Sequence, residues 1–259
     1  MGKIIAISNQ KGGVGKTTTS VNLSHAIAQS NKKVLIVDMD PQASTTTSLG
    51  INRSTLFSTT FEVLTGQKNI KDSIVSLKGI NVDILPTSIE LAHIETKLDH
   101  EDREFVLHYK LDEIKDNYDY IFIDCPPSLG LLTISALYAA DSVLIPVQCQ
   151  FLAIDGLTQL LNTIRIVQKK KKINNKRLDI EGVLLTMLDK RTKAGWEIVH
   201  EIKDYFKEGV FETIITSNVA AQVAPTYGVP VLTYAPKSPA SILYKSLARE
   251  VIDKNERRF

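Results

Sequence analysis

Close to its start the sequence reads Asn9-Gln10-Lys11-Gly12-Gly13-Val14-Gly15-Lys16-Thr17-Thr18, and this stretch decides the fold. An apolar run before it, Lys3–Ser8, predicts a buried strand, and Thr17–Ser30 predicts a helix. A strand, a glycine-rich turn and a helix N-terminus aim backbone N–H groups and the positive end of the helix dipole at one point. Such a point suits a phosphate group. A plain strand-to-helix turn also favours glycine, but it does not require Gly-Lys-Thr at its helical end.

The residues of this loop have different expected tasks. Its glycines let the backbone wrap closely around a phosphate, because a Cβ would block the approach or the left-handed conformations. Lys16 is placed to reach the β- and γ-phosphates of a nucleotide, and the Thr17 hydroxyl is placed to ligate Mg²⁺. The nucleotide-binding set expected here is Gly12, Gly13, Val14, Gly15, Lys16, Thr17 and Thr18.

The remainder of the chain alternates short apolar runs with amphipathic stretches of helical length. Further buried strands are expected at Lys33–Asp38, Asn81–Pro86, Tyr120–Asp124, Ser142–Val147 and Ile180–Thr186. Further helices are expected at Ser88–Leu98, Glu104–Asn117, Leu131–Ala140, Ile154–Lys172, Ala194–Phe206 and Pro239–Asp253. This alternation predicts an α/β fold with a mostly parallel sheet and helices on both faces, as one domain over residues 1–259. The hydroxyl-rich stretch Ser44–Thr60 has few apolar anchors and is expected to be a mobile surface loop.

Composition excludes several classes of protein. The 259 residues are 43% hydrophobic and 23% charged, which is typical of globular chains and not of disordered, collagenous or coiled-coil ones. A net charge of +2 does not by itself indicate a polyanionic partner. No apolar stretch approaches the roughly 20 residues that span a bilayer. Two cysteines, Cys125 and Cys149, are too few for a disulfide framework, so we expect them in the core of a cytoplasmic protein.

The loop departs from the strict pattern G-x-x-x-x-G-K-[ST], because Gln10 stands at the first glycine position and Lys11 adds a second lysine. Four later landmarks accompany it: Val37–Gln42, Tyr120–Pro127, Pro146–Cys149 and Gly182–Asp189. Together they resemble the ParA/MinD class of P-loop ATPases with a deviant Walker A loop, and within it the Soj-type ParA partition ATPases. The resemblance covers about residues 1–240. It implies ATP and Mg²⁺ as ligands, and a short form without an N-terminal helix-turn-helix domain.

The resemblance also implies roles for individual residues. The family lysine at Lys11 reaches the partner's phosphates across an ATP-bound homodimer, so Lys11, Lys16 and Asp40 form the implied catalytic set. Asp40 matches the aspartate that orients the attacking water, and Asp124 matches the one that holds Mg²⁺ through a water. Asp38 either supports the metal shell or caps its loop, and both interpretations stay open. The family further implies non-specific DNA binding and a ParB-type centromere-binding partner that stimulates hydrolysis.

Two basic clusters are candidates for DNA contact and for a nucleoid-associated location. Arg191 aligns with a family arginine associated with DNA, and Lys193 lies beside it. The other cluster comprises Arg165, Lys169, Lys170, Lys171 and Lys172, close to Lys176 and Arg177. Several phosphate contacts suffice for non-specific binding, so both clusters on one face would serve. For the lysine run, a solvated helix end is the simpler interpretation.

One stretch departs from Soj-type relatives, which read Arg-Asn-Val-Arg-Leu-Ser-Glu-Ala-Pro. Here Ser217–Pro225 keeps Asn218 and Pro225 but has neither arginine. The resemblance implies contacts to the nucleotide base at Asn218 and Pro225, and the lost arginines predict weak DNA binding. The alternatives are a ParA-like cargo-positioning ATPase with weak or no DNA binding, and a MinD-like ATPase that cycles on membranes. The membrane alternative is disfavoured, because Lys254–Phe259 has one apolar residue where a membrane helix needs a broad apolar face.

Overall fold

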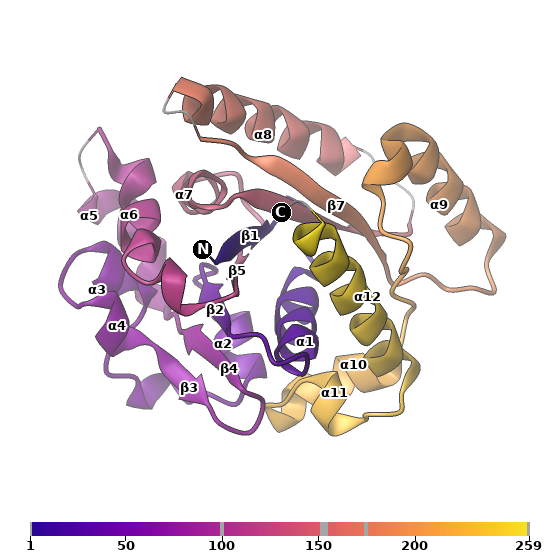
Figure 1. Cartoon of the computed structure of the whole chain (residues 1–259), viewed down its shortest axis with the longest axis horizontal. Helices are drawn as coiled ribbons and strands as arrows, with labels where there is room; N and C mark the ends of the chain where they lie inside the picture. Colours follow the sequence, from indigo (N-terminus) through magenta and orange to yellow (C-terminus); the bar gives the residue numbers. More distant parts are fainter. Residues whose placement is uncertain (1, 99–100, 151–154, 174–175, 258–259) are drawn as a thin grey trace.

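The strands form one sheet in the order β3-β4-β2-β5-β1-β6-β7 (Figure 1). The computed structural model describes residues 2–98, 101–150, 155–173 and 176–257, and within them the sheet has seven strands. These are β1 (Lys3–Ile7), β2 (Val34–Asp38), β3 (Val75–Leu77), β4 (Val82–Leu85), β5 (Tyr120–Asp124), β6 (Ser142–Gln148) and β7 (Asp179–Thr186). Every neighbouring pair is parallel except β3 with β4, which is antiparallel. The expected mostly parallel sheet is confirmed.

Helices connect the strands and cover both faces of the sheet (Figure 1). They are α1 (Lys16–Ala28), α2 (Ser44–Ser48), α3 (Thr60–Leu64), α4 (Ile70–Ser73), α5 (Ile94–Lys97), α6 (Val106–Asp112), α7 (Leu131–Ala139), α8 (Asp155–Ile173), α9 (Lys193–Phe206), α10 (Val219–Val223), α11 (Val231–Tyr234) and α12 (Pro239–Glu256). The helix predicted at 154–172 starts at Ile154, which lies outside the described residues. Within the described ranges, every helix is too short or too polar to cross a membrane.

The alternation of side chains along the strands builds two cores. In β1, Ile4 and Ala6 face a core that also takes in residues of α6, α7 and α8. Ile5 and Ile7 face the opposite core, which α1 and α12 cover. The period of two residues is the pattern expected for a strand buried on both faces. Helix α12 packs against α1, so its apolar stripe is used inside the molecule.

Three expectations about local structure are wrong. The segment 44–60, expected to be a mobile loop, contains α2 and a 3₁₀ turn at Arg53–Thr55, and Thr45 and Thr46 in α2 are fully buried. The helix expected at 104–117 is split into the turn Arg103–Phe105, α6 and the turn Lys115–Asn117. It breaks because Ile114 leaves the helical conformation (φ −131°) and enters the core. The helix expected at 88–98 is likewise a 3₁₀ turn, Ile89–His93, followed by α5.

The register of the sheet brings several chain segments together at its carboxyl edge. Asp38 at the end of β2 pairs with Asp124 at the end of β5, and Asp124 also pairs with Ile7 of β1. Carboxyl ends of parallel strands face the crevice where α/β proteins bind ligands. The glycine-rich loop that leaves β1 therefore lies beside both aspartates.

The two edges of the sheet are closed in different ways. Residues 210–216 run along the outer side of β7, where Phe211 N donates to Val183 O (3.0 Å) and Ile215 N donates to Leu185 O (2.9 Å). Gly182 makes room for this segment, because a Cβ there would lie 2.5 Å from the Phe211 ring. The other edge is β3, a strand of three residues that was not predicted. Its Val-Ser-Leu sequence is too short to carry a strand pattern.

Candidate functional site

The loop between β1 and α1 has the conformation that a phosphate cradle requires. Gly13 (φ 75°) and Gly15 (φ 92°) are left-handed, and Gly15 is the N-cap of α1. A Cβ built on Gly12 or Gly13 would meet nothing within 4 Å, so this side of the loop is open. The loop is tied to the sheet, because Thr186 Oγ1 donates to Val14 O (2.8 Å). A pre-formed ring of N–H groups at a helix N-terminus suits an anion.

Lys16 lies under this loop and is largely buried. Its Nζ donates to the backbone oxygen of Lys11 at 3.2 Å. Burial lowers the pKa of the Lys16 ammonium, while Asp124, Cys125 and Asp40 oppose that shift. A buried cation at a helix N-terminus is a charge partner for a phosphate bound in the loop.

Asp124 is fully buried and accepts three hydroxyl groups. Oδ2 accepts from Thr17 Oγ1 (2.9 Å) and Thr45 Oγ1 (2.6 Å), and Oδ1 accepts from Ser20 Oγ (2.8 Å). Burial raises the pKa of this carboxyl, and the three hydroxyls oppose the rise. A threonine hydroxyl and a carboxylate side by side are the hard oxygen donors that Mg²⁺ prefers, with phosphate oxygens and water completing the shell. The donor set therefore fits a magnesium ion at the mouth of the open loop.

Asp38 caps the loop that carries Asp40. Its Oδ1 accepts from Asp40 N (3.1 Å), and its Oδ2 accepts from Thr46 N (2.9 Å) and Thr46 Oγ1 (2.7 Å). Burial, with the neighbouring Asp124 as a second cause, raises the pKa of Asp38 to about 7. Asp40 is 9% exposed, while Asp38 and Asp124 are 0% exposed. These are the hydrogen bonds of a loop cap, and support of a metal shell by Asp38 stays a prediction.

Four polar residues of this site were missed from the sequence: Ser20, Thr45, Thr46 and Thr87. The threonines of α2 were part of the segment taken for a loop. A signal was present, since three consecutive threonines follow closely after Asp38, a strand-end aspartate that needs donors when buried. Ser20 lies one turn after Lys16 in α1, on the side that faces β5.

The stretch 217–225 forms a second wall at the same edge of the sheet. Asn218 caps α10, because its Oδ1 accepts from Ala220 N at 3.0 Å, and Pro225 lies in the 3₁₀ turn Ala224–Tyr227. A cavity of about 720 Å³ opens beside Asn218. Its wall includes Gln148, Met187, Asp189, Arg191, Ser217 and Gln222.

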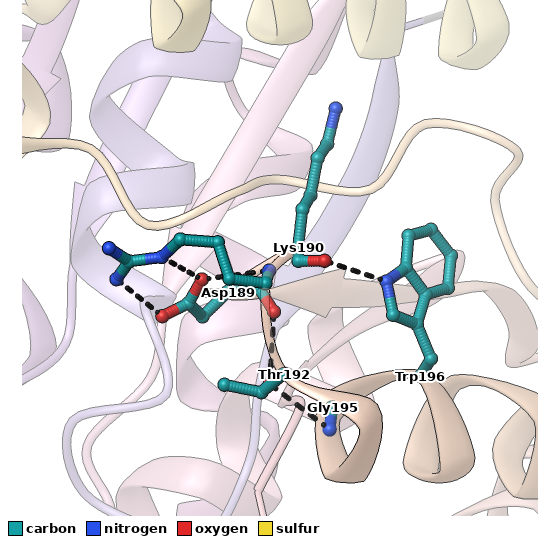
Figure 2. A network of polar contacts seen from close by, with 6 residues as sticks. Asp189, Lys190, Thr192, Gly195 and Trp196 are labelled. Atoms are coloured by element: carbon teal, nitrogen blue, oxygen red, sulfur yellow. Dashed lines mark hydrogen bonds and ion pairs between the residues drawn. The ribbon is translucent and has the colours of Figure 1, made fainter.

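Arg191 lines this cavity. Its side chain is held by the neighbouring Asp189, which is labelled in Figure 2. Its Nε and Nη2 donate to the two carboxylate oxygens of Asp189 at 2.9 and 2.7 Å. The guanidinium lowers the pKa of Asp189 to about 2, so this carboxylate stays charged at neutral pH. Trp196 supports the turn by donating from Nε1 to Lys190 O (3.1 Å). Nζ of Lys193 lies 3.5 Å from Oε1 of Glu197, so these two side chains form an ion pair.

The lysine run on α8 lies at the opposite, amino edge of the sheet, so the structure does not bring the two basic clusters together. The expectation that Lys171 contacts DNA is wrong, because this side chain is 3% exposed and donates from Nζ to Ala140 O, just before β6. Lys170 is paired with Glu104 at 2.7 Å. The other members, Arg165, Lys169 and Lys172, are exposed.

The apolar stripe of α8 explains the burial of Lys171. Buried residues recur along it at Leu157, Leu160, Ile164 and Val167, and Lys171 is the next position in the series. Residues at these spacings share one helix face. Because a buried position recurs every three or four residues along α8, a run of four lysines places one of them in the core.

This chain is similar in sequence to known proteins. Residues 2–180 match the family described as AAA domain. The chain is 50% identical to the sporulation initiation inhibitor protein Soj of Bacillus subtilis, over 97% of this chain and 98% of the relative. It is 42% identical to the chromosome-partitioning ATPase Soj of Treponema pallidum, over the full length of both.

A solved structure agrees with these relatives. Cobyrinic acid a,c-diamide synthase of Mycobacterium smegmatis, with bound ATP analogue and magnesium, superposes with a TM-score of 0.85 at 33% identity. The superposition covers 97% of this chain and 95% of that one. With its phosphate loop, its paired strand-end aspartates and this similarity along its whole length, the chain belongs to the Soj/ParA family of chromosome-partitioning ATPases.

Proposed function

We propose that this partition ATPase works as an ATP-dependent DNA-segregation switch. It forms an ATP-sandwich homodimer, binds DNA without sequence preference, and hydrolyses ATP when a ParB-type partner stimulates it. A cytoplasmic, nucleoid-associated location follows from that cycle. The observation that carries the proposal is the open glycine loop above Lys16, Thr17 and Asp124, in a chain of the ParA family.

Each group of the site has a task that its surroundings support. As an ATPase of this family, the chain uses ATP and magnesium. Lys16 and the loop N–H groups bind phosphate oxygens, and Thr17 with Asp124 would hold the metal, which neutralises phosphate charge when bound. Asp40 retains some exposure and lies on a loop fixed by Asp38, so it can orient a water for attack.

The side chain of Lys11 supports the dimer. Its backbone is engaged on both sides, since its N donates to Asn9 Oδ1 (3.0 Å) and its O accepts from Lys16 Nζ. Its ammonium makes no hydrogen bond or ion pair with any residue that the structure describes. Two ATP molecules facing each other repel, and a lysine that reaches across the interface offsets that charge.

Replacing Lys11 tests the dimer. Lys11→Ala should keep nucleotide binding by the monomer and lose the ATP-dependent dimer, as followed by light scattering. Lys78→Ala, at an exposed position far from the loop, is the matched control and should dimerise normally. A persistent dimer in Lys11→Ala would show that this lysine does not act on a partner.

The proposal for DNA places the contact surface at the carboxyl edge, around Arg191, Lys193 and the 217–225 stretch. Restoring arginine with Ser217→Arg and Ala220→Arg should tighten ATP-dependent DNA binding. A dimer would gain four phosphate contacts, and each steepens the salt dependence by about 0.9. Unchanged affinity and slope in the double variant would mean that this stretch does not face DNA.

The second candidate is a cargo-positioning ATPase with weak or no DNA binding. The Asp189–Arg191 pair favours it, because the arginine charge is already matched within its own turn. Co-sedimentation with DNA and with anionic liposomes, each with ATP, separates the candidates. Binding to DNA alone supports segregation, binding to neither supports the cargo-positioning alternative, and binding to liposomes supports membrane cycling.

A further inference from the structure

The short helix α2 carries two buried hydroxyl groups that reach the two strand-end carboxylates of the site. We propose that Thr45 and Thr46 are positioning residues for ATP hydrolysis. Thr46 fixes Asp38 and through it the loop of Asp40, and Thr45 fixes the metal-side carboxylate of Asp124. This inference rests on the proposed nucleotide site. It adds α2 as the element that aligns the loop of Asp40 with the carboxylate of Asp124.

Thr46 controls the direction of the Asp38 carboxylate. It donates twice to Oδ2, from its backbone N (2.9 Å) and from Oγ1 (2.7 Å). Its hydroxyl is itself held, because Thr87 N donates to Thr46 Oγ1 at 3.1 Å. The other carboxylate oxygen of Asp38 accepts from Asp40 N. A chain of hydrogen bonds therefore runs from Thr87 through Thr46 and Asp38 to the backbone of Asp40.

All links of this chain lie in the protein interior. Thr46, Thr87 and Asp38 are each 0% exposed. A hydrogen bond in such surroundings is strong, and a buried carboxyl group that loses a donor is left with an unsatisfied oxygen. Removing the Thr46 hydroxyl should therefore let Asp38 rotate, and with it the loop that places Asp40.

Thr45 plays the matching part for Asp124. Its hydroxyl donates to Oδ2 at 2.6 Å, the same oxygen that accepts from Thr17. The Thr17 hydroxyl is also a candidate metal ligand. Thr45 is not, so its hydroxyl can orient this oxygen whether or not a metal is bound. Groups that orient a ligand carboxylate in this way typically affect metal affinity by 10–100-fold when removed.

Helix α2 is anchored at both ends, which makes it suitable for positioning. Ala43, its N-cap, is left-handed (φ 57°) and fully buried. Past its end, Gly50 packs against Gly228, where an added Cβ would lie 2.6 Å from the Gly50 Cα. Gly228 caps the 3₁₀ turn Ala224–Tyr227, which packs against α2 and contains Pro225, where the resemblance implies a contact to the nucleotide base.

The test for Thr46 uses a near-isosteric change and a rescue. Thr46→Val should lower kcat at least 10-fold while ATP affinity stays within about 3-fold, and Thr46→Ser should restore kcat. Thr47→Val is the matched control, since Thr47 Oγ1 donates to Ala43 O and the structure gives it no contact with either aspartate. In the nucleotide-free protein, amide exchange at Asp40 should be faster in Thr46→Val than in Thr47→Val.

The test for Thr45 reads binding rather than turnover. Thr45→Val should raise the magnesium concentration needed for tight ATP binding about 10-fold or more, and leave ATP binding in EDTA unchanged. Thr45→Ser should behave as the unaltered protein. The same titration on Thr47→Val provides the baseline.

Several outcomes overturn the inference. Normal kcat and normal amide exchange in a folded Thr46→Val would do so, as would a serine variant as impaired as the valine variant. If Thr46→Val does not fold, Thr46→Ala and Asp38→Asn take its place, and their effects on kcat should be less than additive in the double variant. Fully additive effects on kcat would show that Thr46 does not act through Asp38. Tight ATP binding by Lys16→Ala would instead sink the proposed nucleotide site itself.

Discussion

Asp40 differs from Asp38 and Asp124 because it alone of the three keeps some exposure, and its own Oδ1 accepts only from Gln42 N (3.0 Å) among the hydrogen bonds that the structure describes. Asp40→Ala should therefore bind ATP normally and still form the dimer, because the backbone N–H to Asp38 remains. Hydrolysis should fall 100-fold or more, as expected when the group that positions the nucleophile is lost. Single-turnover hydrolysis measures this, with the exposed Asp72→Ala as control. An unchanged rate would move the role to Asp38.

In the proposed DNA-binding surface, Asp189 is the residue that limits how much charge Arg191 can offer. With its pKa near 2, Asp189 is ionised at any neutral pH, and it faces the guanidinium with both oxygens. Asp189→Asn removes one negative charge and frees Arg191, so DNA binding should tighten several-fold and its salt slope should steepen by about 0.9 per subunit. Asp204→Asn, at the far end of α9, should change neither. Weaker binding in Asp189→Asn would place DNA elsewhere.

At the scale of elements, α8 carries a lysine whose charge works against folding. Burial lowers the pKa of Lys171 to about 8, below its ordinary value. The folded protein therefore disfavours the charged form, and this cost is present at pH 7 and fades as pH rises above about 8. Relative to Lys171→Met, the unaltered protein should gain about 1–3 kcal/mol of unfolding free energy between pH 7 and pH 10.

Urea denaturation at the two pH values measures this difference. Lys172→Met, at the exposed neighbour, is the control and should show no such dependence on pH. If the unfolding free energies of Lys171→Met and the unaltered protein change by the same amount between the two pH values, the ammonium is not desolvated in solution.

The elements also show what a sequence can and cannot predict. β1, β2, β5 and β6 follow directly from runs of Ile, Val and Leu, and the loop after β1 follows from its glycines and Lys16. α2 could not be predicted in this way, since its reason to form lies in carboxylates that adjoin only once β2 and β5 are in register. The burial of Lys171 was predictable from the helical stripe, but the charge of the lysine run concealed it.

At the scale of the whole molecule, two distant segments meet through glycine. Gly50 and Gly228 pack backbone to backbone, both with positive φ (74° and 67°). Gly228→Ala should lower the unfolding free energy by about 2 kcal/mol or more, because it combines an unfavourable conformation with a clash. It should also lower kcat, since α2 must shift. Gly79→Ala, where a Cβ meets nothing within 4 Å, should be neutral in thermal melts.

The covered border of the sheet has a consequence for how copies of this chain can associate. An unprotected strand margin invites aggregation by recruiting a strand from another molecule, and such pairing ignores which nucleotide is bound. Residues 210–216 occupy that position along β7, and the opposite margin, β3, offers three residues. Both margins therefore offer little free backbone for pairing with a strand of another molecule. In the proposed cycle, self-association then takes place on the phosphate-loop side, where ATP hydrolysis would reverse it.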